Sequence, residues 1–317
     1  MSDLLGKISV EDLEKVKIIL SLVNNEQPRE SITLRVFSDE YKNFIENNRS
    51  SSYLKSVEIS LVYLDRYFGS ERSIDSIQYK DIEAFMIHLQ KKAKKGNAVY
   101  FRNLKAAFNK AKDWGYIKEN HFIKIKLPKR QKTAPVFLDR DRLQAISDKL
   151  RNPVVKNVVM LAFNTGMRLD EIVNLTWKNV DLNGRTITVG DENYITKGRT
   201  QRFIPINDEM LKLLKAMHSK KRKSKIIPIK NDYVFDKGVN HKFTGDYFSK
   251  QFKCACKDAT VDERIHFHSL RHSFASNLAQ KGVSLYIIKE LLGHSAIATT
   301  EIYAHLNLYT LREAISR

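Results

Sequence analysis

The chain has 317 residues with 42% hydrophobic content, and 55 lysine and arginine residues against 36 aspartate and glutamate residues give a formal net charge of +19. This length allows two domains with cores of their own, and so large a basic excess favours a polyanionic partner, nucleic acid above all, over a merely solvated surface. No apolar run approaches the roughly 20 residues of a membrane span, the amino end lacks the pattern of a signal peptide, and no concentrated basic amphipathic helix suggests a membrane surface.

The two cysteines, Cys254 and Cys256, bear on the compartment. With one residue between them they are too close for an ordinary disulfide, and no second pair completes a zinc site. Reduced thiols are typical of a reducing compartment. We therefore expect a cytoplasmic protein.

Changes in composition and periodicity divide the chain into four parts. These are an amino-terminal helix or arm at 1–30, a helical domain at 31–126, a basic linker with two prolines at 127–135, and a second domain at 136–317. Four apolar stripes at helical spacing predict a small bundle of four helices in the first domain. The stripes are Phe37, Tyr41, Phe44 and Ile45; Val57, Leu61, Leu64 and Phe68; Ile82, Phe85, Met86 and Leu89; and Tyr100, Leu104, Ala107, Phe108 and Ala111.

Basic side chains crowd the loop after the third predicted helix and the helix that follows. They are Lys91, Lys92, Lys94, Lys95, Arg102 and Lys105. Taken one at a time, each is an ordinary solvated charge. As a cluster beside Tyr100 and Phe101, they favour contacts with the phosphates of a nucleic acid.

The second domain begins with a helix that starts at Asp139. A strongly apolar helix from Val154 to Thr165 should be buried, with Gly166 ending it. Arg168 follows, three residues before Glu171. This spacing alone is equally consistent with a weak surface salt bridge.

Between residues 185 and 206 the helical period gives way to alternation. Turn signals at 190–193 and 197–200 predict a three-stranded antiparallel meander with Lys197 at the tip of its second hairpin, where a lysine is ordinarily just a solvated residue. The remaining predicted elements are a helix at 207–218, a basic loop KKRKSK, a short buried strand at 233–235 and a helix at 244–257. The predicted fold is therefore mainly α with a small antiparallel β-meander, in two domains.

The stretch from His268 to His305 gathers imidazoles, a guanidinium and a phenol among small and apolar residues. A buried helix is predicted to carry His268 and Arg271 on one face. A second helix is predicted over 283–292 with Gly293 as its C-cap, and a third with Ser295 as its N-cap and Tyr303 on it.

These polar residues also have plain structural interpretations. His294 could be a helix-end residue that favours the helix dipole, and Tyr303 a half-buried packing tyrosine. His272 is more readily a packing or hydrogen-bonding group than a catalyst, and His305 is taken as structural.

Two separated motifs resemble the catalytic boxes of the tyrosine recombinases, the integrase or Xer-like family. His268-x-x-Arg271-His272, Leu292-Gly293-His294 and Thr300-Glu301-Ile302-Tyr303 resemble the second box in order and spacing, and the run TGMRLDEI at 165–172 resembles the first. The resemblance runs from about Ser31 to the carboxyl end. It implies a helical core-binding (SAM-like) DNA-binding domain followed by a catalytic domain.

Breaking a phosphodiester without a metal requires cationic donors at the nonbridging oxygens, a nucleophile, and a proton source for the leaving oxygen. The chain offers one set of suitable side chains: Arg168, Lys197, His268, Arg271, His294 and Tyr303. The resemblance implies that Tyr303 attacks to form a 3′-phosphotyrosyl link, that the two arginines bind the phosphate with the two histidines assisting, and that Lys197 protonates the 5′ oxygen. It also implies that Glu171 orients the site.

The resemblance further implies a site-specific recombinase that exchanges strands through a Holliday junction. Its partners would be double-stranded DNA with a specific core site and a homotetramer on two such sites, with a paralogous recombinase or accessory protein as a further candidate. No metal, ATP or other cofactor is expected, since the chain has no HExxH arrangement and no Walker-type glycine loop.

Two other functions remain open on the sequence. One is a type IB topoisomerase-like enzyme that relaxes supercoils as a monomer, against which the lysine hairpin and the separate Leu-Gly-His box favour a recombinase. The other is a non-catalytic basic DNA-binding protein. Resolution of chromosome dimers and integration of a mobile element are not distinguished.

Overall fold

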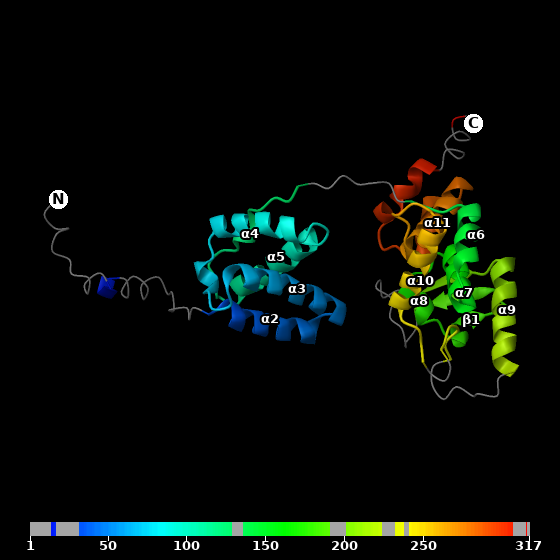
Figure 1. Cartoon of the computed structure of the whole chain (residues 1–317), viewed down its shortest axis with the longest axis horizontal. Coiled ribbons are helices and arrows are strands. Elements are labelled where there is room, and N and C mark those ends of the chain that lie inside the picture. Colours follow the sequence, from blue (N-terminus) through cyan, green and yellow to red (C-terminus); the bar gives the residue numbers. More distant parts are fainter. Residues whose placement is uncertain are drawn as a thin grey trace. The chain divides into compact units, whose positions relative to one another are not determined.

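The structure is a computed structural model that describes residues 14–16, 32–128, 136–190, 201–223, 232–237, 241–306 and 315 (Figure 1). The chain divides into two compact units, Met1–Gln131 and Lys132–Arg317. Most of the predicted arm and linker lies outside the described residues, so the domain boundaries given above stay a prediction.

The amino-terminal unit is a helical bundle, as predicted. Its elements are α2 (Leu34–Asn48), α3 (Ser51–Phe68), η1 (Ile74–Ser76), α4 (Tyr79–Lys92), α5 (Asn97–Asp113) and η2 (His121–Ile123). Thr33 and Ser50 cap α2 and α3 by accepting backbone hydrogen bonds, and Gly69 ends α3 with a φ of 86°. The four predicted stripes supply most of the buried core, with Phe37, Phe85 and Leu104 at its centre.

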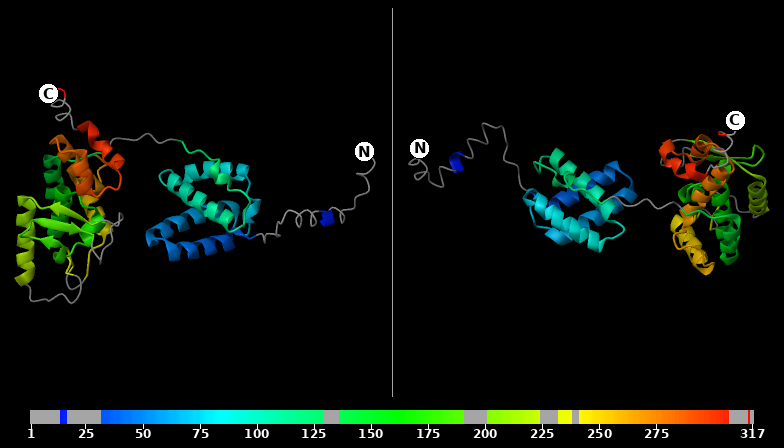
Figure 2. Two further views of the ribbon diagram at one scale, coloured as in Figure 1. Left: turned by 180° about the vertical axis from the view of Figure 1, so that it is seen from behind. Right: turned by 90° about the horizontal axis from the view of Figure 1, so that it is seen from above.

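The carboxyl-terminal unit packs helices around a small sheet (Figures 1 and 2). Its elements are α6 (Arg140–Lys149), α7 (Pro153–Thr165), α8 (Leu169–Val173), η3 (Trp177–Asn179), β1 (Val180–Asp181), β2 (Thr186–Val189), β3 (Arg202–Pro205), α9 (Asp208–Lys223), α10 (Gly245–Asp258), α11 (Phe267–Gln280), α12 (Leu285–Leu292), η4 (Ile297–Thr299) and η5 (Glu301–Leu306). The buried helix α7 packs against α11, α10, α9 and α8 and so ties the unit together. Asp139 and Thr244 cap α6 and α10 where the sequence predicted helix starts.

The sheet is antiparallel with the strand order β1-β2-β3. Val180 pairs with Ile187, and Ile187 in turn pairs with Ile204. A three-stranded meander was predicted, but its first strand begins before residue 185. The predicted strand around Tyr194 and the hairpin tip with Lys197 lie outside the described residues.

Three local predictions were wrong. Helix α9 continues to Lys223 instead of ending at His218, because Lys221 bonds to the main-chain oxygen of Tyr233 and to Asp236. Tyr233 forms only an isolated bridge with Thr176 and no strand.

The third of these errors concerns the segment that carries Tyr303. It is not an α-helix capped by Ser295. It consists of the two 3₁₀ segments η4 and η5, and η4 is preceded by Ala296, which supplies no side-chain cap.

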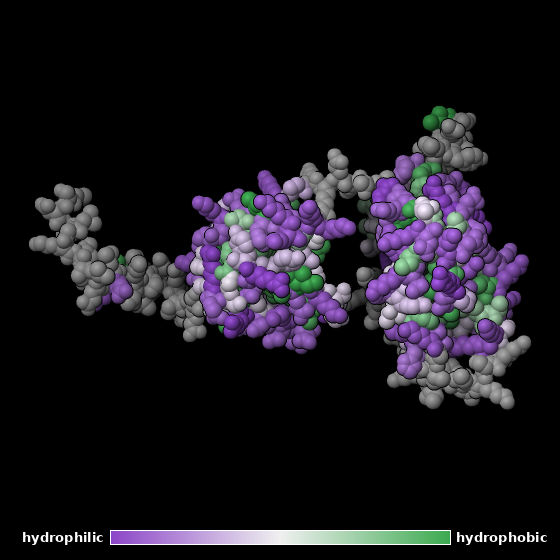
Figure 3. All heavy atoms as spheres, viewed as in Figure 1, coloured by the Kyte–Doolittle hydropathy of each residue, from purple (hydrophilic) through white to green (hydrophobic). Residues whose placement is uncertain are grey.

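The apolar side chains of the carboxyl-terminal unit form two clusters of different size. The larger is the main core, which includes Val158, Phe252 and Leu270. The smaller, called here the satellite cluster, lies among α11, α12 and η5 and consists of Ala275, Ala279, Ile288, Leu292 and Tyr303, with Phe274, Leu278, Val283, Leu285 and Leu306 packed against it. Hydrophilic residues predominate on the visible face of each unit (Figure 3). None of the described helices has the length and apolar character needed to cross a membrane.

Candidate active site

Arg168 and Glu171 form a pair at the start of α8. The carboxylate of Glu171 accepts a hydrogen bond from the backbone N–H of Arg168 at 2.7 Å and one from its guanidinium at 3.0 Å. Glu171 is only 3% exposed. The interpretation of this spacing as a surface salt bridge is therefore wrong, since the carboxylate lies inside the protein.

Arg202, at the start of β3, is the second partner of Glu171 and was missed by sequence reasoning. Its guanidinium donates to both carboxylate oxygens of Glu171, at 3.0 and 2.7 Å, and to the main-chain oxygen of Leu291 at 3.0 Å. A signal was present in the sequence: Arg202 shares the inward face of its strand with Ile204, while Phe203 faces out. An arginine at an inward position needs a buried anion.

The ionisation of Glu171 reflects these two arginines. Burial by itself raises the pKa of the Glu171 carboxyl. The hydrogen bonds and positive charge of Arg202, and then of Arg168, outweigh that effect and hold the pKa below its ordinary value. Glu171 is therefore an anion that fixes both guanidinium groups near neutral pH.

Arg271 projects from α11 and is held by the two turns that resemble the catalytic boxes. Its guanidinium donates to the main-chain oxygens of Gly166 at 2.7 Å and Leu292 at 2.6 Å. Gly166 adopts a φ of 63°, and a Cβ there would lie 2.4 Å from the ring of Phe274. A glycine is thus required for the close approach of this turn to α11. Burial, and then the charge of Arg168, lower the pKa of the Arg271 guanidinium to about 9.

Arg168, Arg202 and Arg271, called here the arginine pocket, all contact the end of α12 or the turn Gly293-His294 that follows it. Gly293 ends α12 with a φ of 65°, and a Cβ there would lie 2.9 Å from the Arg202 side chain. Its main-chain oxygen accepts a hydrogen bond of 3.4 Å from Arg168. Nδ1 of His294 lies 2.9 Å from Oγ1 of the buried Thr300. The predicted C-cap is confirmed, and the turn orients His294 toward the segment that precedes Tyr303.

Both His268 and His294 are electrically neutral near pH 7. Burial lowers the pKa of His268 to about 4, assisted by the charges of His272 and Arg271. Burial, and then the charges of Arg271 and Arg168, lower the pKa of His294 to about 4. Neutral imidazoles beside guanidinium groups can donate hydrogen bonds to an anion without adding charge.

Tyr303 lies in η5 with its ring in the satellite cluster and is 1% exposed. Its hydroxyl oxygen lies 2.6 Å from Nδ1 of His272. Burial raises the pKa of the phenol to about 12, although the charge of Arg271 opposes this effect. Tyr303 is thus more buried than the half-buried residue of the structural interpretation, and it is protonated at neutral pH.

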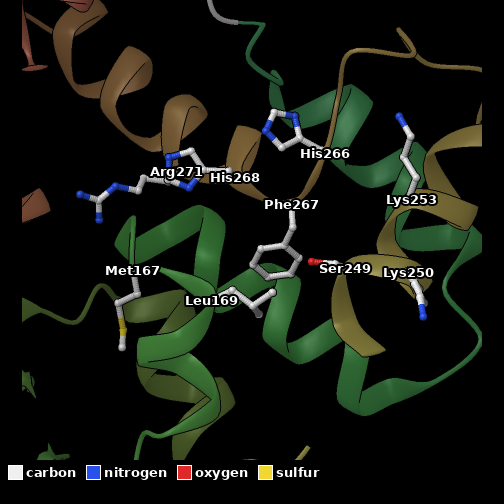
Figure 4. A pocket seen from close by; sticks show the side chains of 9 residues that line it. All are labelled: Met167, Leu169, Ser249, Lys250, Lys253, His266, Phe267, His268 and Arg271. Carbon is white, nitrogen blue, oxygen red and sulfur yellow. The ribbon is translucent and has the colours of Figure 1, made fainter. Parts of the chain in front are cut away.

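A cavity of about 480 Å³ opens beside the histidines and Arg271 (Figure 4). Its floor contains Met167, Leu169 and Phe267, with His268 and Arg271 along one side. Basic groups of α10 and the segment before α11 stand at the other side, namely Lys250, Lys253 and His266. The cavity therefore has an apolar floor and positively charged or imidazole sides, which suits an anionic ligand.

The structure brings together five of the six candidate catalytic residues, from α8, α11, the α12–η4 turn and η5. The sixth, Lys197, lies outside the described residues. The candidate DNA-binding residues lie in the amino-terminal unit: Lys91 at the end of α4, Lys94 and Lys95 in the following turn, and Arg102 and Lys105 on α5.

The aromatic residues beside that basic cluster do not share its exposure. Phe101 is in the core, and Tyr100 stacks on Tyr63 with ring centroids 5.3 Å apart. Within the described ranges, no three histidine, cysteine, aspartate or glutamate side chains are grouped as metal ligands would be.

Comparison with known proteins identifies the family that shares this arrangement. Residues 136–309 match the phage integrase family, and residues 33–127 match the phage integrase SAM-like domain. The chain belongs to the phage integrase family. The resemblance to tyrosine recombinases drawn from the two motifs is thereby confirmed, as is the expectation of an enzyme of the site-specific recombinase type.

Curated relatives of the chain are similar over most of its length. A tyrosine recombinase of Thermosipho africanus is 29% identical, with 82% of this chain and 89% of the relative covered. Tyrosine recombinase XerD of Listeria innocua is also 29% identical, over 87% of this chain and 95% of the relative. Tyrosine recombinase XerC of Oceanobacillus iheyensis is 26% identical, over 85% and 90%.

Solved structures share the fold. The Tn1549 transposon integrase in complex with a circular intermediate DNA has a TM-score of 0.75 at 21% identity, with 90% of this chain and 100% of the other covered. A lambda integrase dimer bound to a COC′ core site has a TM-score of 0.73 at 19% identity, covering 95% and 84%. The predicted fold class, mainly helical with a small antiparallel sheet in two domains, is confirmed.

Proposed function

We propose that this tyrosine recombinase cleaves and rejoins DNA at a specific core site through a 3′-phosphotyrosyl intermediate. The observation that carries the proposal is that His268 and Arg271 line one cavity, with Arg168 bonded to the Gly293-His294 turn beside Arg271. The phenol of Tyr303 is hydrogen-bonded to His272, which follows Arg271 on α11. Relatives named as tyrosine recombinases and the DNA complexes of lambda and Tn1549 integrases support it.

Each group has a role that follows from its chemistry. The two arginines neutralise the nonbridging oxygens, since a guanidinium presents a planar fork of donors to a phosphate. The neutral imidazoles of His268 and His294 donate further hydrogen bonds. Tyr303 attacks phosphorus and releases the 5′ oxygen, which takes a proton from Lys197. The free 5′ hydroxyl then attacks the phosphotyrosyl of a partner strand, so no external energy source is consumed.

We further propose that four protomers act on two DNA sites and pass through a Holliday junction, and that this takes place in the cytoplasm. The lambda integrase tetramer bound to a Holliday junction is an example of such an assembly in this fold.

The test of cleavage uses a nicked duplex from which the short strand beyond the cleavage position diffuses away, so that the covalent complex accumulates. Its sequence would be selected for binding to the full chain from a random duplex pool. We expect wild-type protein to give a protein–DNA adduct on a denaturing gel and Tyr303→Phe to give none while still binding DNA. An adduct with Tyr303→Phe would rule out Tyr303 as the nucleophile.

The basic cluster on α4 and α5 is proposed to contact DNA phosphates. If each protomer meets about 6–10 phosphates, its affinity should fall by about 10³–10⁵ between 50 and 200 mM salt. Changing Lys94 and Lys95 to glutamine should reduce the slope of log K against log salt by about 0.9 for each phosphate that the variant no longer neutralises. An unchanged slope would remove this cluster from the DNA interface.

A further inference from the structure

The hydroxyl of Tyr303 has a polar partner to which the proposed function assigns no chemical role. Its oxygen lies 2.6 Å from Nδ1 of His272, with the two ring centroids 6.0 Å apart. The distance is short for a hydrogen bond between a hydroxyl and a nitrogen, and so indicates a well-formed one. Within the part of the chain that the structure describes, no other hydrogen bond to this hydroxyl is present.

The two histidines already assigned to the phosphate do not contact the phenol in this way. Nδ1 of His294 is engaged with Thr300. The ring of His268 packs edge-on against His272, with centroids 5.0 Å apart and an interplanar angle of 88°. Of His268, His272 and His294, it is therefore His272 that is placed to exchange a proton with the nucleophile.

The ionisation of the two partners suits a transfer from the phenol to the imidazole. The phenol has a raised pKa of about 12, so it does not ionise by itself near neutral pH. Burial, followed by the charges of His266 and Arg271, lowers the pKa of His272. His272 is thus neutral near pH 7 and has a free lone pair for the proton.

The other charged groups on neighbouring elements are occupied elsewhere. Lys253 of α10 donates to the main-chain oxygen of Ile265, and Lys289 of α12 pairs with Glu290 beside it. In η5, Glu301 and His305 are exposed. The charges that act on His272 are therefore those of Arg271 and His266, and both disfavour its protonated form.

We propose that His272 is a catalytic residue, whose Nδ1 takes the phenol proton as Tyr303 attacks the scissile phosphate. This inference rests on the proposed function. In cleavage, the bond between the Tyr303 oxygen and phosphorus forms and the bond from phosphorus to the 5′ oxygen breaks. The phenol proton moves to His272, and the 5′ oxygen takes its proton from Lys197.

Rejoining runs through the same groups in reverse. The 5′ hydroxyl gives up its proton to Lys197 and attacks phosphorus, and the departing phenolate takes the proton back from the His272 imidazolium. The charge of Arg271 destabilises that imidazolium, which favours the return of the proton. Because Arg271 and His272 are consecutive, with Cα atoms about 3.8 Å apart, one helix places both the phosphate ligand and the base.

Three variants separate a base from a hydrogen-bonding or packing role. His272→Asn keeps a polar atom near the position of Nδ1 but cannot take up the proton, and His272→Phe removes both properties. His305→Asn is the matched control, since it makes the same change at an exposed histidine two residues from the nucleophile. Each full-length variant would be compared with wild type for adduct formation on the selected nicked duplex, from pH 5.5 to 9.5.

We expect His272→Asn and His272→Phe to slow adduct formation by about 10²–10⁴ at pH 7, which is the usual contribution of a general base. The wild-type rate should level off above pH 6.5. The His272→Asn rate should keep rising about tenfold per pH unit, as hydroxide replaces the lost base. His305→Asn should behave as wild type. A His272→Asn rate within threefold of wild type, or faster, would reduce His272 to a residue that only holds the resting tyrosine and overturn the proposal.

A second substrate distinguishes His272 from the general acid. Placing sulfur at the bridging 5′ position gives a leaving group that needs no proton. We expect this duplex to restore cleavage by Lys197→Ala and to leave His272→Asn slow. Restoration of both variants would contradict the assignment of His272 as a base. No adduct with wild type on either duplex would refute the proposed function itself, and this inference with it.

Discussion

Three arginines are held by buried partners from several elements, namely Arg168, Arg202 and Arg271, whereas the hydroxyl of Tyr303 has one hydrogen bond, to His272. Arg168 and Arg202 are joined through Glu171, and Arg271 donates to the main-chain oxygens of two tight turns. These contacts involve α8, β3 and α11, and all three elements contribute side chains to the main core.

Tyr303 is held by fewer contacts than the three arginines. Its ring belongs to the satellite cluster, and its backbone to a 3₁₀ segment outside the main core. Fewer buried apolar contacts and a weaker type of helix permit local opening at a low free-energy cost. The proposed phosphate-binding groups are therefore held by more buried contacts than the proposed nucleophile, for which local opening is the less costly.

The largest effect is expected from Glu171→Ala, which leaves Arg202 buried without its anion. Removing one partner of a buried pair costs about 3–5 kcal/mol, so the Tm of the carboxyl-terminal unit should fall by roughly 6–20 °C. Trp177 lies in this unit, and a Trp114→Phe background makes its fluorescence the reporter. Asp246→Ala is the control.

Asp246 pairs with Lys250 on the exposed surface of α10, with both side chains at least 70% exposed. Its loss should leave the transition unchanged, because exposed pairs contribute little. Equal shifts for Glu171→Ala and Asp246→Ala would show that the arginine pocket is not held by its buried anion.

The next effect concerns the satellite cluster. Truncating the fully buried Ile288 to alanine should lower the free energy of unfolding by about 2–5 kcal/mol. The loss should be confined to local unfolding of α12 and η5. Hydrogen exchange should therefore speed up around Tyr303 more than around α7. Leu270→Ala, a truncation in the main core, should instead raise exchange across the whole unit. Uniform acceleration in both variants would mean that the two regions unfold as one.

The sequence predicts the two regions unequally well. Helices α2 to α5, α7 and α11 follow from apolar stripes because burial of one face is a local property of the sequence. The C-cap at Gly293 follows from its residue type for a similar reason. The family resemblance then supplies the candidate catalytic set, of which five members converge in the structure.

Contacts between distant segments could not be read in this way. The bidentate bond from Arg202 to Glu171 joins residues 31 positions apart, and no spacing rule links them. The hydrogen bond from Tyr303 to His272 likewise depends on how η5 folds back on α11. Residue type alone predicts Ser295 as an N-cap, but the chain there forms 3₁₀ segments, the first of which lacks a side-chain cap.

The two buried imidazoles near the arginines make the stability of the protein depend on pH. His268 and His294 have folded-state pKa values lowered to about 4 from 6.5, so the unfolded chain binds more protons between these values. Stability should thus be full above about pH 6.5 and decline as the pH falls toward 4. Thermal unfolding at pH 7.5 and 5 measures this decline, which the double variant His268→Asn, His294→Asn should reduce. An equal decline in that variant would assign the effect to other groups.

The smallest effect is expected at Thr300, the residue that links the two regions. It precedes Tyr303 by three positions, and its buried hydroxyl lies 2.9 Å from Nδ1 of His294. Thr300→Val keeps the shape but loses the hydrogen bond, which contributes about 0.5–1.5 kcal/mol, so adduct formation should slow by about 2- to 12-fold. Thr300→Ser keeps the hydroxyl and should stay near wild type. If valine and serine were equally slow, packing beside η5 and not the orientation of His294 would connect Tyr303 to the arginine pocket.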